Sequence, residues 1–372
     1  MIFKGLQVAS FRNLADAELD IREKDVFLVG ENGQGKTNFL EALYFCAYGS
    51  SFRGVRDSEL IRLGEPGCSV AAQFGGSLYE KALITLEKGK KTIVLDGKPV
   101  HDRKTLLSVV PCIVFCHEDM EFVAGTPERR RWFFDQTQSL YDPVYLEDLR
   151  AYRKVLKTRN TVLKDRWGTL NHEVIPILEA LDAQIVHYGL RLMEQRKEAA
   201  QSFSAAFRPL YEAVSGINHV HVQYAPSWKA TTADTVIAFL QTRWEADIAA
   251  GTTLSGPHRD HYHFTQGERE FAGKASTGQR RLLALLLRIA QARRFSEMTG
   301  KAPVLLLDDV LLELDGEKRR KFLQVMPEYD QAFYTFLPEE PFEGYRQTNT
   351  LVYHVAQGSL SASKHPREST GS

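Results

Sequence analysis

The chain has 372 residues, 43% of them apolar and 25% charged, a composition typical of a globular protein with two or three structural units. Its 47 Lys and Arg residues balance 47 Asp and Glu residues, which argues against a globally basic nucleic-acid binder, so any DNA contact must use a local patch. No apolar run reaches the roughly 18 residues of a membrane span, and the N-terminus lacks a signal-peptide pattern, so we expect no membrane contact and a cytoplasmic location.

Three short strands are expected at the N-terminus, over residues 2–9, 15–21 and 26–29. The third strand leads directly into the sequence GENGQGKT, residues 30–37, and a helical pattern follows from Asn38. A strand, a glycine loop and a helix at the spacing G-x-x-x-x-G-K-T are typical of a phosphate-binding loop. This context disfavours the alternative of a glycine-rich turn with an incidental lysine.

Each part of this loop has a chemical role. The glycines allow backbone N–H groups to face phosphate oxygens at a helix start, where the helix dipole also favours anions. Lys36 is expected to reach the β and γ phosphates of ATP, and the Thr37 hydroxyl to ligate Mg²⁺. The predicted nucleotide-binding residues of the loop are Gly30, Glu31, Asn32, Gly33, Gln34, Gly35, Lys36 and Thr37.

The next segment is rich in strands. An antiparallel meander is expected over residues 69–74, 78–87 and 91–95, with a turn at Asp96-Gly97, and a buried strand over 109–115. The four cysteines have no paired C-x-x-C spacing, which favours buried free thiols over a zinc site; they are Cys46, Cys68, Cys112 and Cys116.

Beyond residue 116 the pattern becomes helical. Apolar residues keep near-helical spacing over 146–163 and 174–185, and Gly168 and Asn171 break the pattern between them. We therefore expect an inserted arm that contains two long antiparallel helices. Strands are expected to resume at 219–224 and 261–264, followed by an apolar helix over 281–296.

A buried strand over residues 303–307 ends in two carboxylates, Asp308 and Asp309. In P-loop ATPases such a strand holds Mg²⁺ and positions water, so Asp308 is the predicted metal ligand together with Thr37, and Asp309 the predicted catalytic base. The alternative is that these acids only cap a helix. A helix from residue 316, strands over 332–336 and 350–355, and a disordered tail from Ala356 complete the prediction.

Ser276-Thr277-Gly278-Gln279 precedes the apolar helix and supplies free N–H groups, although an ordinary N-cap turn has the same composition. Its place before the acidic strand resembles the ATP-binding-cassette superfamily, whose signature segment grips the γ-phosphate bound by the opposite subunit. Leu312-Glu313-Leu314-Asp315 resembles the D-loop of that superfamily. The resemblance implies an ATP-dependent homodimer in which the trans residues are Ser276, Thr277, Gly278, Gln279 and Asp315.

Within that superfamily the chain resembles the RecF family over most of residues 1–355. The residues that carry the resemblance are GENGQGKTNFLEAL, VLLLDDVLLELD, Phe11-Arg12-Asn13-Leu14, Ser51-Phe52-Arg53, Glu118-Asp119, Arg129-Arg130-Arg131 and Gly256-Pro257-His258-Arg259-Asp260. The implied fold class is an α/β ATP-binding-cassette head, a P-loop NTPase lobe with a mixed sheet, plus an inserted α-helical second lobe. The expected parts are the ATP lobe in 1–116 and 251–355, the helical lobe in 117–250 and a flexible tail in 356–372.

The resemblance also implies a function. Family members bind DNA with a duplex component near single-strand gaps, dimerise on ATP, and work with RecR and RecO to help load RecA. A weak, DNA-dependent ATPase activity would time release. Arg12 and Arg53 are expected to face nucleotide or phosphate.

Four departures from the superfamily pattern predict slow hydrolysis, below about 10 s⁻¹. The signature reads Ser-Thr-Gly-Gln rather than Ser-Gly-Gly-Gln, and Asp309 is one methylene shorter than the usual Glu. The histidine expected after the strand over 332–336 is absent, with Thr335 and Phe336 in that region. Glu118 is the nearest substitute for a missing glutamine at the lobe junction.

DNA contacts are expected from basic residues of the second lobe, although such residues are also common on merely solvated helix faces. The candidates are Arg129, Arg130, Arg131, Arg150, Arg153, Lys154, Lys157 and Arg159. His258 and Arg259 either serve the site or hold the lobe together.

The sequence also allows three other functions. A transporter ATPase would need the missing glutamine and histidine, and a chromosome-bridging SMC protein would need a far longer coiled coil. A nucleotide-switched scaffold with negligible turnover differs from the main prediction in whether Asp309 is a base.

Overall fold

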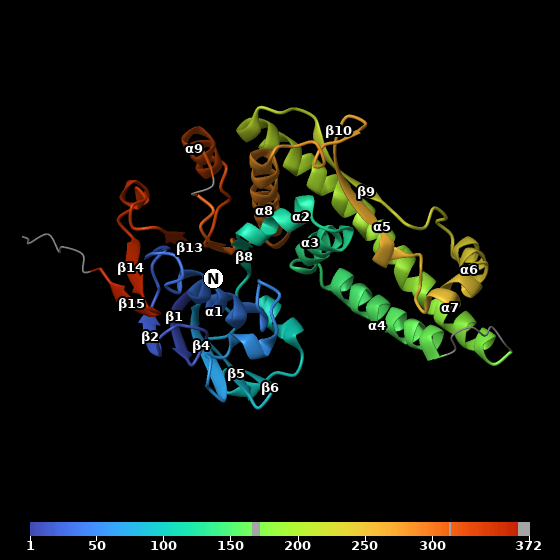
Figure 1. Cartoon of the computed structure of the whole chain (residues 1–372), viewed down its shortest axis with the longest axis horizontal. Coiled ribbons are helices and arrows are strands. Elements are labelled where there is room, and N and C mark those ends of the chain that lie inside the picture. The colour runs from blue at the N-terminus through green and yellow to red at the C-terminus, as the bar shows by residue number, and fades with distance from the viewer. Residues whose placement is uncertain (166–171, 312–313, 364–372) are drawn as a thin grey trace, which may run out of the picture. The chain divides into compact units, whose positions relative to one another are not determined.

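A computed structural model describes residues 1–165, 172–311 and 314–363 (Figure 1). The chain forms two compact units. Unit 1 comprises residues 1–118 and 295–372, and unit 2 comprises residues 119–294. The helical segment is therefore an insertion into unit 1. The insertion ends at residue 294 rather than near the expected residue 250, because the strand β10 (His261–Gln266) and most of the helix α8 (Thr277–Thr299) belong to unit 2.

The first sheet of unit 1 has the strand order β15-β14-β3-β13-β12-β8. All neighbouring strands from β14 to β8 are parallel, and β15 is antiparallel to β14. Several strands are buried throughout, as expected for a parallel sheet covered on both faces. Their bounds are β3 Asp25–Val29, β8 Cys112–Phe115, β12 Val304–Leu307, β13 Gln331–Phe336, β14 Thr350–Ala356 and β15 Ser359–Ala362.

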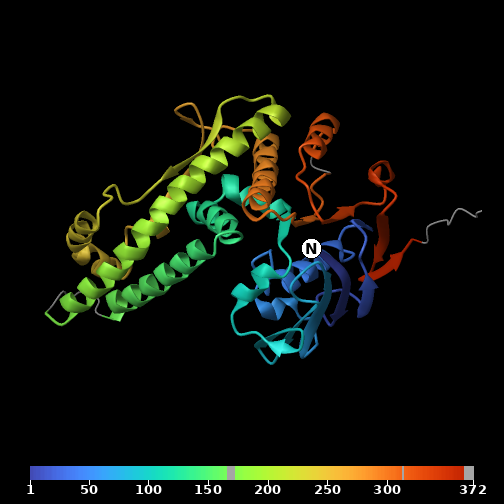
Figure 2. The same ribbon diagram turned by 180° about the vertical axis from the view of Figure 1, so that it is seen from behind.

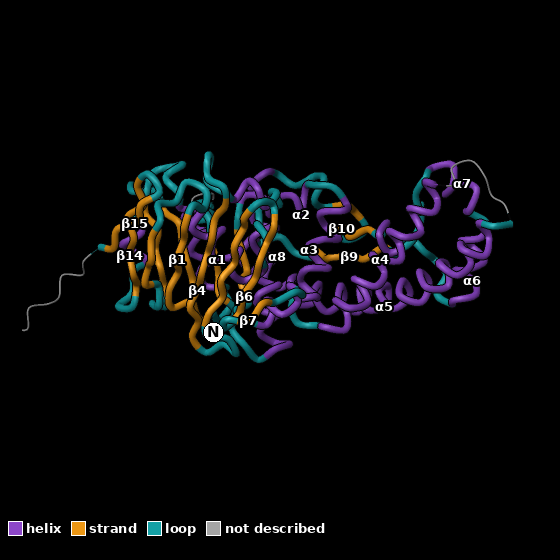
Figure 3. The backbone as a smooth tube through the Cα atoms, turned by 90° about the horizontal axis from the view of Figure 1, so that it is seen from below, coloured by secondary structure: helices purple, strands orange, loops and turns teal. Residues whose placement is uncertain are grey.

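The second sheet of unit 1 is antiparallel, in the order β2-β1-β4-β5-β6-β7 (Figure 3). The helix α1 (Lys36–Tyr48) contacts strands of both sheets and is buried on nearly every side, which explains its lack of a polar face. The strands are β1 Ile2–Ala9, β2 Ala17–Asp20, β4 Gly67–Gly75, β5 Lys81–Glu87, β6 Lys90–Leu95 and β7 Lys98–Pro99. The remaining helix of this unit is α9 Gly316–Gln324, and the short 3₁₀ turns are Asp57–Leu60, Arg103–Ser108, His117–Met120 and Phe342–Tyr345.

Unit 2 is built on two long helices, α4 (Pro143–Asp165) and α5 (Val174–Ser215), which lie side by side and antiparallel (Figures 1 and 2). A three-stranded antiparallel sheet, β11-β10-β9, packs against α5. The other elements are α2 Glu121–Ala124, α3 Pro127–Ser139, β9 Val220–Ala225, α6 Ala233–Gln241, α7 Trp244–Ala250, a 3₁₀ turn Pro257–Arg259, β10 His261–Gln266, β11 Arg269–Glu270 and α8 Thr277–Thr299.

Most predicted elements are present, including the meander, the buried strands and the two long helices, and all four cysteines are buried free thiols. The prediction of a disordered tail from Ala356 is wrong for Ser359–Ala362, which form β15. This four-residue strand, Ser-Leu-Ser-Ala, is stabilised by backbone pairing with β14, which composition does not reveal. The predicted break at Gly168 and Asn171 lies outside the described residues.

Candidate functional site

The glycine loop between β3 and α1 has the backbone geometry of an anion cradle. Gly33 and Gly35 have φ values of 77° and 116°, a region that favours glycine. No side chain caps the N-terminus of α1, which leaves N–H groups available to an anion. Lys36 donates hydrogen bonds from Nζ to the carbonyls of Gly30 (2.7 Å) and Glu31 (3.2 Å), which hold it across the loop.

The motif Phe11-Arg12-Asn13-Leu14 packs against the glycine loop. Asn13 donates from Nδ2 to the Gly33 carbonyl (3.1 Å) and accepts a hydrogen bond from Asn38 Nδ2 (2.7 Å). A Cβ at Gly35 would lie 3.1 Å from Asn13 Oδ1, so the motif and the loop pack closely. Asn13 is a site residue that the sequence motif contained but to which no role was assigned.

Arg12 does not line the cavity over the loop but pairs with Glu41, which is fully buried in α1. Its Nε and a terminal nitrogen lie 2.8 and 3.1 Å from the two carboxylate oxygens of Glu41. An unpaired carboxylate at this depth would be strongly destabilising, so Arg12 fixes the helix that follows the loop. Arg53 does line the cavity and donates to Asn38 Oδ1 (3.2 Å).

The C-terminal hairpin closes the other side of the loop. The Gln357 N–H donates to Gln34 Oε1 (2.6 Å), and the Gly358 N–H donates to the Gln34 carbonyl (2.9 Å). Gly358 has φ of 79°, and a Cβ there would lie 1.8 Å from the Asn13 carbonyl oxygen. The turn predicted to be disordered is thus part of the loop's scaffold.

The two predicted metal ligands meet in the structure. Thr37 donates its hydroxyl hydrogen bond to Asp308 Oδ1 over 2.9 Å, although 271 positions separate the two residues. They meet because β3 and β12 are parallel and β13 separates them, so both chain segments leave the same edge of the sheet. Burial, followed by the neighbouring Asp309 carboxylate, raises the pKa of Asp308 to about 6.

Asp309, the predicted base, is held by Thr335 at the end of β13. The Asp309 N–H donates to Thr335 Oγ1 (2.7 Å), and Thr335 Oγ1 lies 2.7 Å from Asp309 Oδ1 and 3.3 Å from Asp308 Oδ1. Asp309 has φ of 51°, a conformation that is uncommon for a residue with a side chain. Thr335, in the region where the resemblance implied a histidine, thus binds both residues of the acid pair.

Glu340 is a further acidic group that the sequence did not single out. The pKa of Glu340 is raised, mainly by burial and also by the Asp309 carboxylate, while Lys36 lowers it. Glu340 therefore lies within electrostatic range of Asp309 and Lys36. Its Oε1 accepts the Leu337 N–H over 3.0 Å. Glu118, the proposed glutamine substitute, similarly contributes to the raised pKa of Asp308. No sequence motif could have identified Glu340, because its relation to Asp309 and Lys36 arises only in the folded chain.

A cavity of about 290 Å³ lies over the loop. This volume is at the lower limit of small-molecule sites, which suits phosphate groups with a cation rather than a whole nucleotide. Its lining residues are Asn32, Gly33, Gly35, Lys36, Thr37, Asn38, Arg53 and Asp309. The backbone geometry of the loop, rather than the size of the cavity, makes this the candidate phosphate site.

The arrangement fits a magnesium ion. A hydroxyl and a buried carboxylate lie together, and burial, followed by the neighbouring Asp309 carboxylate, raises the pKa of that carboxylate, so a bound cation would be stabilised there. Mg²⁺ usually takes one or two protein oxygens and completes its shell with water and phosphate oxygens. Among the described residues, no group of three or more His, Cys, Asp or Glu side chains is placed to hold a metal ion.

The predicted signature forms the start of α8 in unit 2. The Ser276 N–H donates to Gln279 Oε1 (2.8 Å), and the Gln279 N–H donates to Ser276 Oγ (3.2 Å), which is a reciprocal capping box. Ser276, Thr277 and Gly278 are exposed, and a Cβ at Gly278 would meet nothing within 4 Å. Asp315 caps α9 by accepting the Lys318 N–H, and Leu312 and Glu313 of the predicted D-loop lie outside the described residues.

The basic DNA candidates divide into two groups. Arg130 donates to the carbonyls of Tyr262 and Val123, and Arg131 donates to the Asp260 carbonyl, so both help to hold unit 2 together. Arg159 is fully buried between Asp182 and Asp247, and its interpretation as a DNA contact is wrong. The exposed candidates are Arg129, Arg150, Arg153, Lys154 and Lys157.

The segment Gly256-Pro257-His258-Arg259-Asp260 lies at the core of unit 2. Asp260 is fully buried and accepts from Arg196 (2.9 Å), the Ser227 N–H (2.7 Å) and the Tyr224 hydroxyl. His258 lies 2.7 Å from the Tyr152 hydroxyl, and burial lowers its pKa to about 4. His258 and Asp260 thus have structural roles, whereas Arg259 is exposed.

The chain matches known proteins along nearly its whole length. The profile of the RecF/RecN/SMC N terminal domain family matches residues 2–360. The DNA replication and repair protein RecF of Treponema pallidum is 43% identical over 94% of this chain and 98% of its own length. The RecF of Halalkalibacterium halodurans is 30% identical over 97% and 99% of the two chains.

Solved structures agree with this match. The structure of the recombination mediator protein RecF-ATP in the RecFOR pathway superposes with a TM-score of 0.88, at 27% identity and 97% coverage of both chains. An Smc head bound to the C-winged helix domain of ScpA has a TM-score of 0.57 at 14% identity, which indicates a shared fold. None of the described helices is long and apolar enough to cross a membrane. The chain belongs to the RecF family of DNA replication and repair proteins, and its fold is that of the ATP-binding-cassette heads shared with SMC proteins.

Proposed function

We propose that the chain is an ATP-dependent DNA-binding protein of recombinational repair and replication restart, which dimerises on ATP and hydrolyses it slowly. The hydrogen bond between Thr37 and Asp308 carries this proposal. It joins a phosphate-binding loop to an acidic strand in the arrangement that P-loop ATPases use for a nucleotide and its metal. The likeness to a solved RecF-ATP structure supports ATP as the nucleotide.

The residues of the loop have separate tasks in this proposal. The N–H groups at the start of α1 and the Lys36 ammonium bind the phosphates, and Thr37 and Asp308 hold Mg²⁺, which neutralises phosphate charge when bound. Asp309 accepts a proton from the attacking water, and Thr335 keeps its carboxylate in place. Arg12, which was expected to face the nucleotide, positions α1 through its pair with Glu41.

The proposed dimer contact is the signature segment at the start of α8, residues 276–279. Gly278 costs helix stability relative to alanine and has open space around it, so packing inside this chain does not require glycine. We propose that this surface meets the phosphates bound by a second copy, with the trans residues Ser276 to Gln279 and Asp315 in the assignment given above. The exposed basic residues Arg129, Arg153 and Lys157 are the proposed DNA contacts. The proposed protein partners are of the RecR and RecO type, and the proposed location is the cytoplasm.

A DNA-binding titration tests this function. The fluorescence anisotropy of a labelled gapped duplex would be followed with the full chain, with and without ATP and Mg²⁺. We expect ATP to strengthen binding at least about tenfold, and Lys36→Met to abolish this gain. Replacing Arg129 and Lys157 by Ala should weaken binding and reduce the salt slope by about one per lost phosphate contact. DNA binding that is unaffected by ATP and by Lys36→Met would contradict the proposal.

A further inference from the structure

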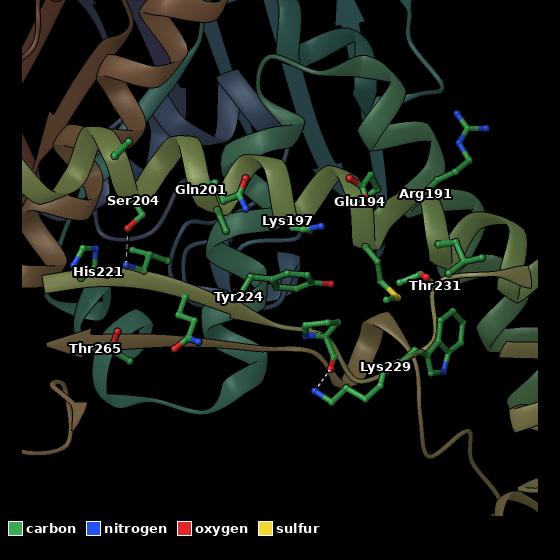
Figure 4. A pocket seen from close by; sticks show the side chains of 18 of the residues that line it. Arg191, Glu194, Lys197, Gln201, Ser204, His221, Tyr224, Lys229, Thr231 and Thr265 are labelled. Atoms are coloured by element: carbon green, nitrogen blue, oxygen red, sulfur yellow. Dashed lines mark hydrogen bonds between the residues drawn. The ribbon is translucent and has the colours of Figure 1, made fainter. Parts of the chain in front are cut away.

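A groove of about 1190 Å³ lies within unit 2, between one face of α5 and the strand β9 (Figure 4). All its lining residues belong to unit 2, and none is a candidate residue of the nucleotide site. Its volume lies above the usual range of small-molecule pockets, roughly 300–1,000 Å³. A segment of several residues therefore fits the groove better than a compact cofactor.

The floor of the groove is apolar and buried. Met193, Val222 and Trp228 line it, with exposed fractions of 8%, 5% and 1%. A groove for single-stranded nucleic acid offers exposed aromatic faces on which bases stack. Trp228 is almost fully buried and offers no such face, and Tyr224 is half-buried with its hydroxyl bound to Asp260. The floor thus suits aliphatic or aromatic side chains of a peptide.

The rim of the groove is basic. Lys197 and Arg208 project from the exposed face of α5, Lys229 lies opposite them, and Glu194 is the acidic residue among those that line the groove. No carboxylate pairs with Lys197, Arg208 or Lys229 within the part of the chain that the structure describes. The closest recorded partner of Lys229 Nζ is the Pro226 carbonyl at 3.0 Å (Figure 4). These cations complement an acidic occupant.

The strand β9 offers backbone groups to such an occupant. Among the described strands it is an edge, paired on one side with β10. Its Val222 N–H points away from β10 and donates to Ser204 Oγ of α5 (3.0 Å). Because strand residues alternate, the N–H and C=O of Tyr224 also face this outer side. Ser204 closes one end of the edge, and the remaining end can pair with an extended backbone.

The helix α5 contributes a further acceptor. Pro209 lies within the helix and has no N–H to donate to the Ala205 carbonyl, four residues before it. Ala205 lines the groove. The Ala205 carbonyl therefore lacks the intrahelical hydrogen bond that a residue other than proline at position 209 would donate to it.

We propose that this groove docks an extended, acidic segment of a partner protein, whose apolar side chains enter between α5 and β9. The carboxylates of the segment face Lys197, Arg208 and Lys229, and its backbone pairs beside Tyr224. The groove gives unit 2 a recruitment surface that is separate from the nucleotide site.

A displayed library of random peptides is the probe. The library would be selected on the full chain and then depleted on the variant Ala205→Trp, which fills the groove at an exposed position without changing charge. We expect the surviving peptides to be enriched in Asp and Glu with one or more aromatic or aliphatic residues. No enrichment over the depleted pool, or enrichment in basic residues, would overturn the proposal.

Charge reversal then tests the rim with a selected peptide by fluorescence anisotropy. Lys197→Glu combined with Arg208→Glu should weaken binding at least about tenfold. The control Lys154→Glu changes an exposed cation on α4, outside the groove, and should leave binding within about twofold. If the rim variants leave peptide binding unchanged, or weaken the binding of a labelled oligothymidylate as much as that of the peptide, the groove is not a peptide site. Circular dichroism at matched temperature confirms that each variant is folded.

Discussion

Thr335 has one hydroxyl and takes part in several contacts at the acid pair. It accepts the N–H of Asp309 and lies within hydrogen-bond distance of Asp309 Oδ1 and, more loosely, Asp308 Oδ1. Asp309 adopts a positive φ, which costs roughly 1 kcal/mol or more unless its surroundings hold it. The hydroxyl therefore maintains the position of the proposed base.

Thr335→Val tests this role, because it removes the hydroxyl and keeps the shape. We expect the ATP hydrolysis rate to fall about tenfold or more, while the affinity for ATP changes by less than about threefold. Steady-state phosphate release and nucleotide binding give the two values. Thr350→Val, a buried threonine at the start of β14, is the matched control and should leave hydrolysis within about twofold. Equal losses in the two variants would assign the effect to packing.

Asp308 couples the site to pH. Its pKa is raised above its ordinary value, so the stability associated with this group is fully present at low pH and is lost as pH rises through about 6. Asp308→Asn removes the carboxylate and should stabilise the nucleotide-free protein at neutral pH.

The stabilisation by Asp308→Asn should grow by about 1 kcal/mol between about pH 5 and about pH 8, because the pKa of Asp308 lies between these values. Urea unfolding of unit 1 at both pH values, without Mg²⁺, measures it. The same variant should bind ATP-Mg²⁺ more weakly. A gain in stability that is independent of pH, or absent, would contradict the buried charge.

Among the elements, the C-terminal hairpin shows most clearly what pattern alone does not predict. The strands β3 and β12 could be predicted because they are short, apolar and followed by chemical motifs. The strand β15 and the turn before it were not predicted. Their conformation depends on the backbone hydrogen bond from Gly358 to Gln34 and on the close approach of Gly358 to Asn13, which no local pattern encodes.

Gly358→Ala should therefore disturb the loop. The added Cβ would lie 1.8 Å from the Asn13 carbonyl oxygen, so the turn must move. We expect a loss of about 2 kcal/mol or more in stability and a clear loss of ATP affinity. Gly89→Ala is the control, because Gly89 has a similar φ of 73° but open space around it. If both variants lose the same stability and neither loses ATP affinity, the hairpin does not support the loop.

A substitution at Gly278 in the helix α8 should change stability and dimerisation in opposite directions. Gly278→Ala should raise the stability of the isolated chain by up to about 1 kcal/mol, since helix propensity improves and the added Cβ would meet no other part of the chain within 4 Å beyond its own helix turn. It should also weaken ATP-dependent dimerisation at least about tenfold, because the added methyl faces the approaching copy. Thermal unfolding and sedimentation give the two quantities. A stabilised variant that dimerises normally would remove this surface from the proposed interface.

At the scale of the whole molecule, the sequence predicted a split ATP lobe with an inserted helical arm, and both are present. The candidate nucleotide residues come from short motifs whose chemistry is local, and the structure brings two of them, Thr37 and Asp308, together. The roles of Arg130, Arg131 and Arg159 could not, because a basic residue on a helix looks the same whether it faces solvent or a buried carbonyl or carboxylate. The buried network of Asp260 and Arg196 joins segments from distant parts of unit 2, which no sequence pattern records.

In the proposed function, ATP completes a site that two copies of the chain share. Sedimentation velocity of the full chain, with and without ATP and Mg²⁺, tests it most directly. We predict a monomer without nucleotide, a dimer with ATP-Mg²⁺, and a monomer under both conditions for Lys36→Met. A chain that binds ATP yet stays monomeric, or that dimerises equally without it, would contradict the account.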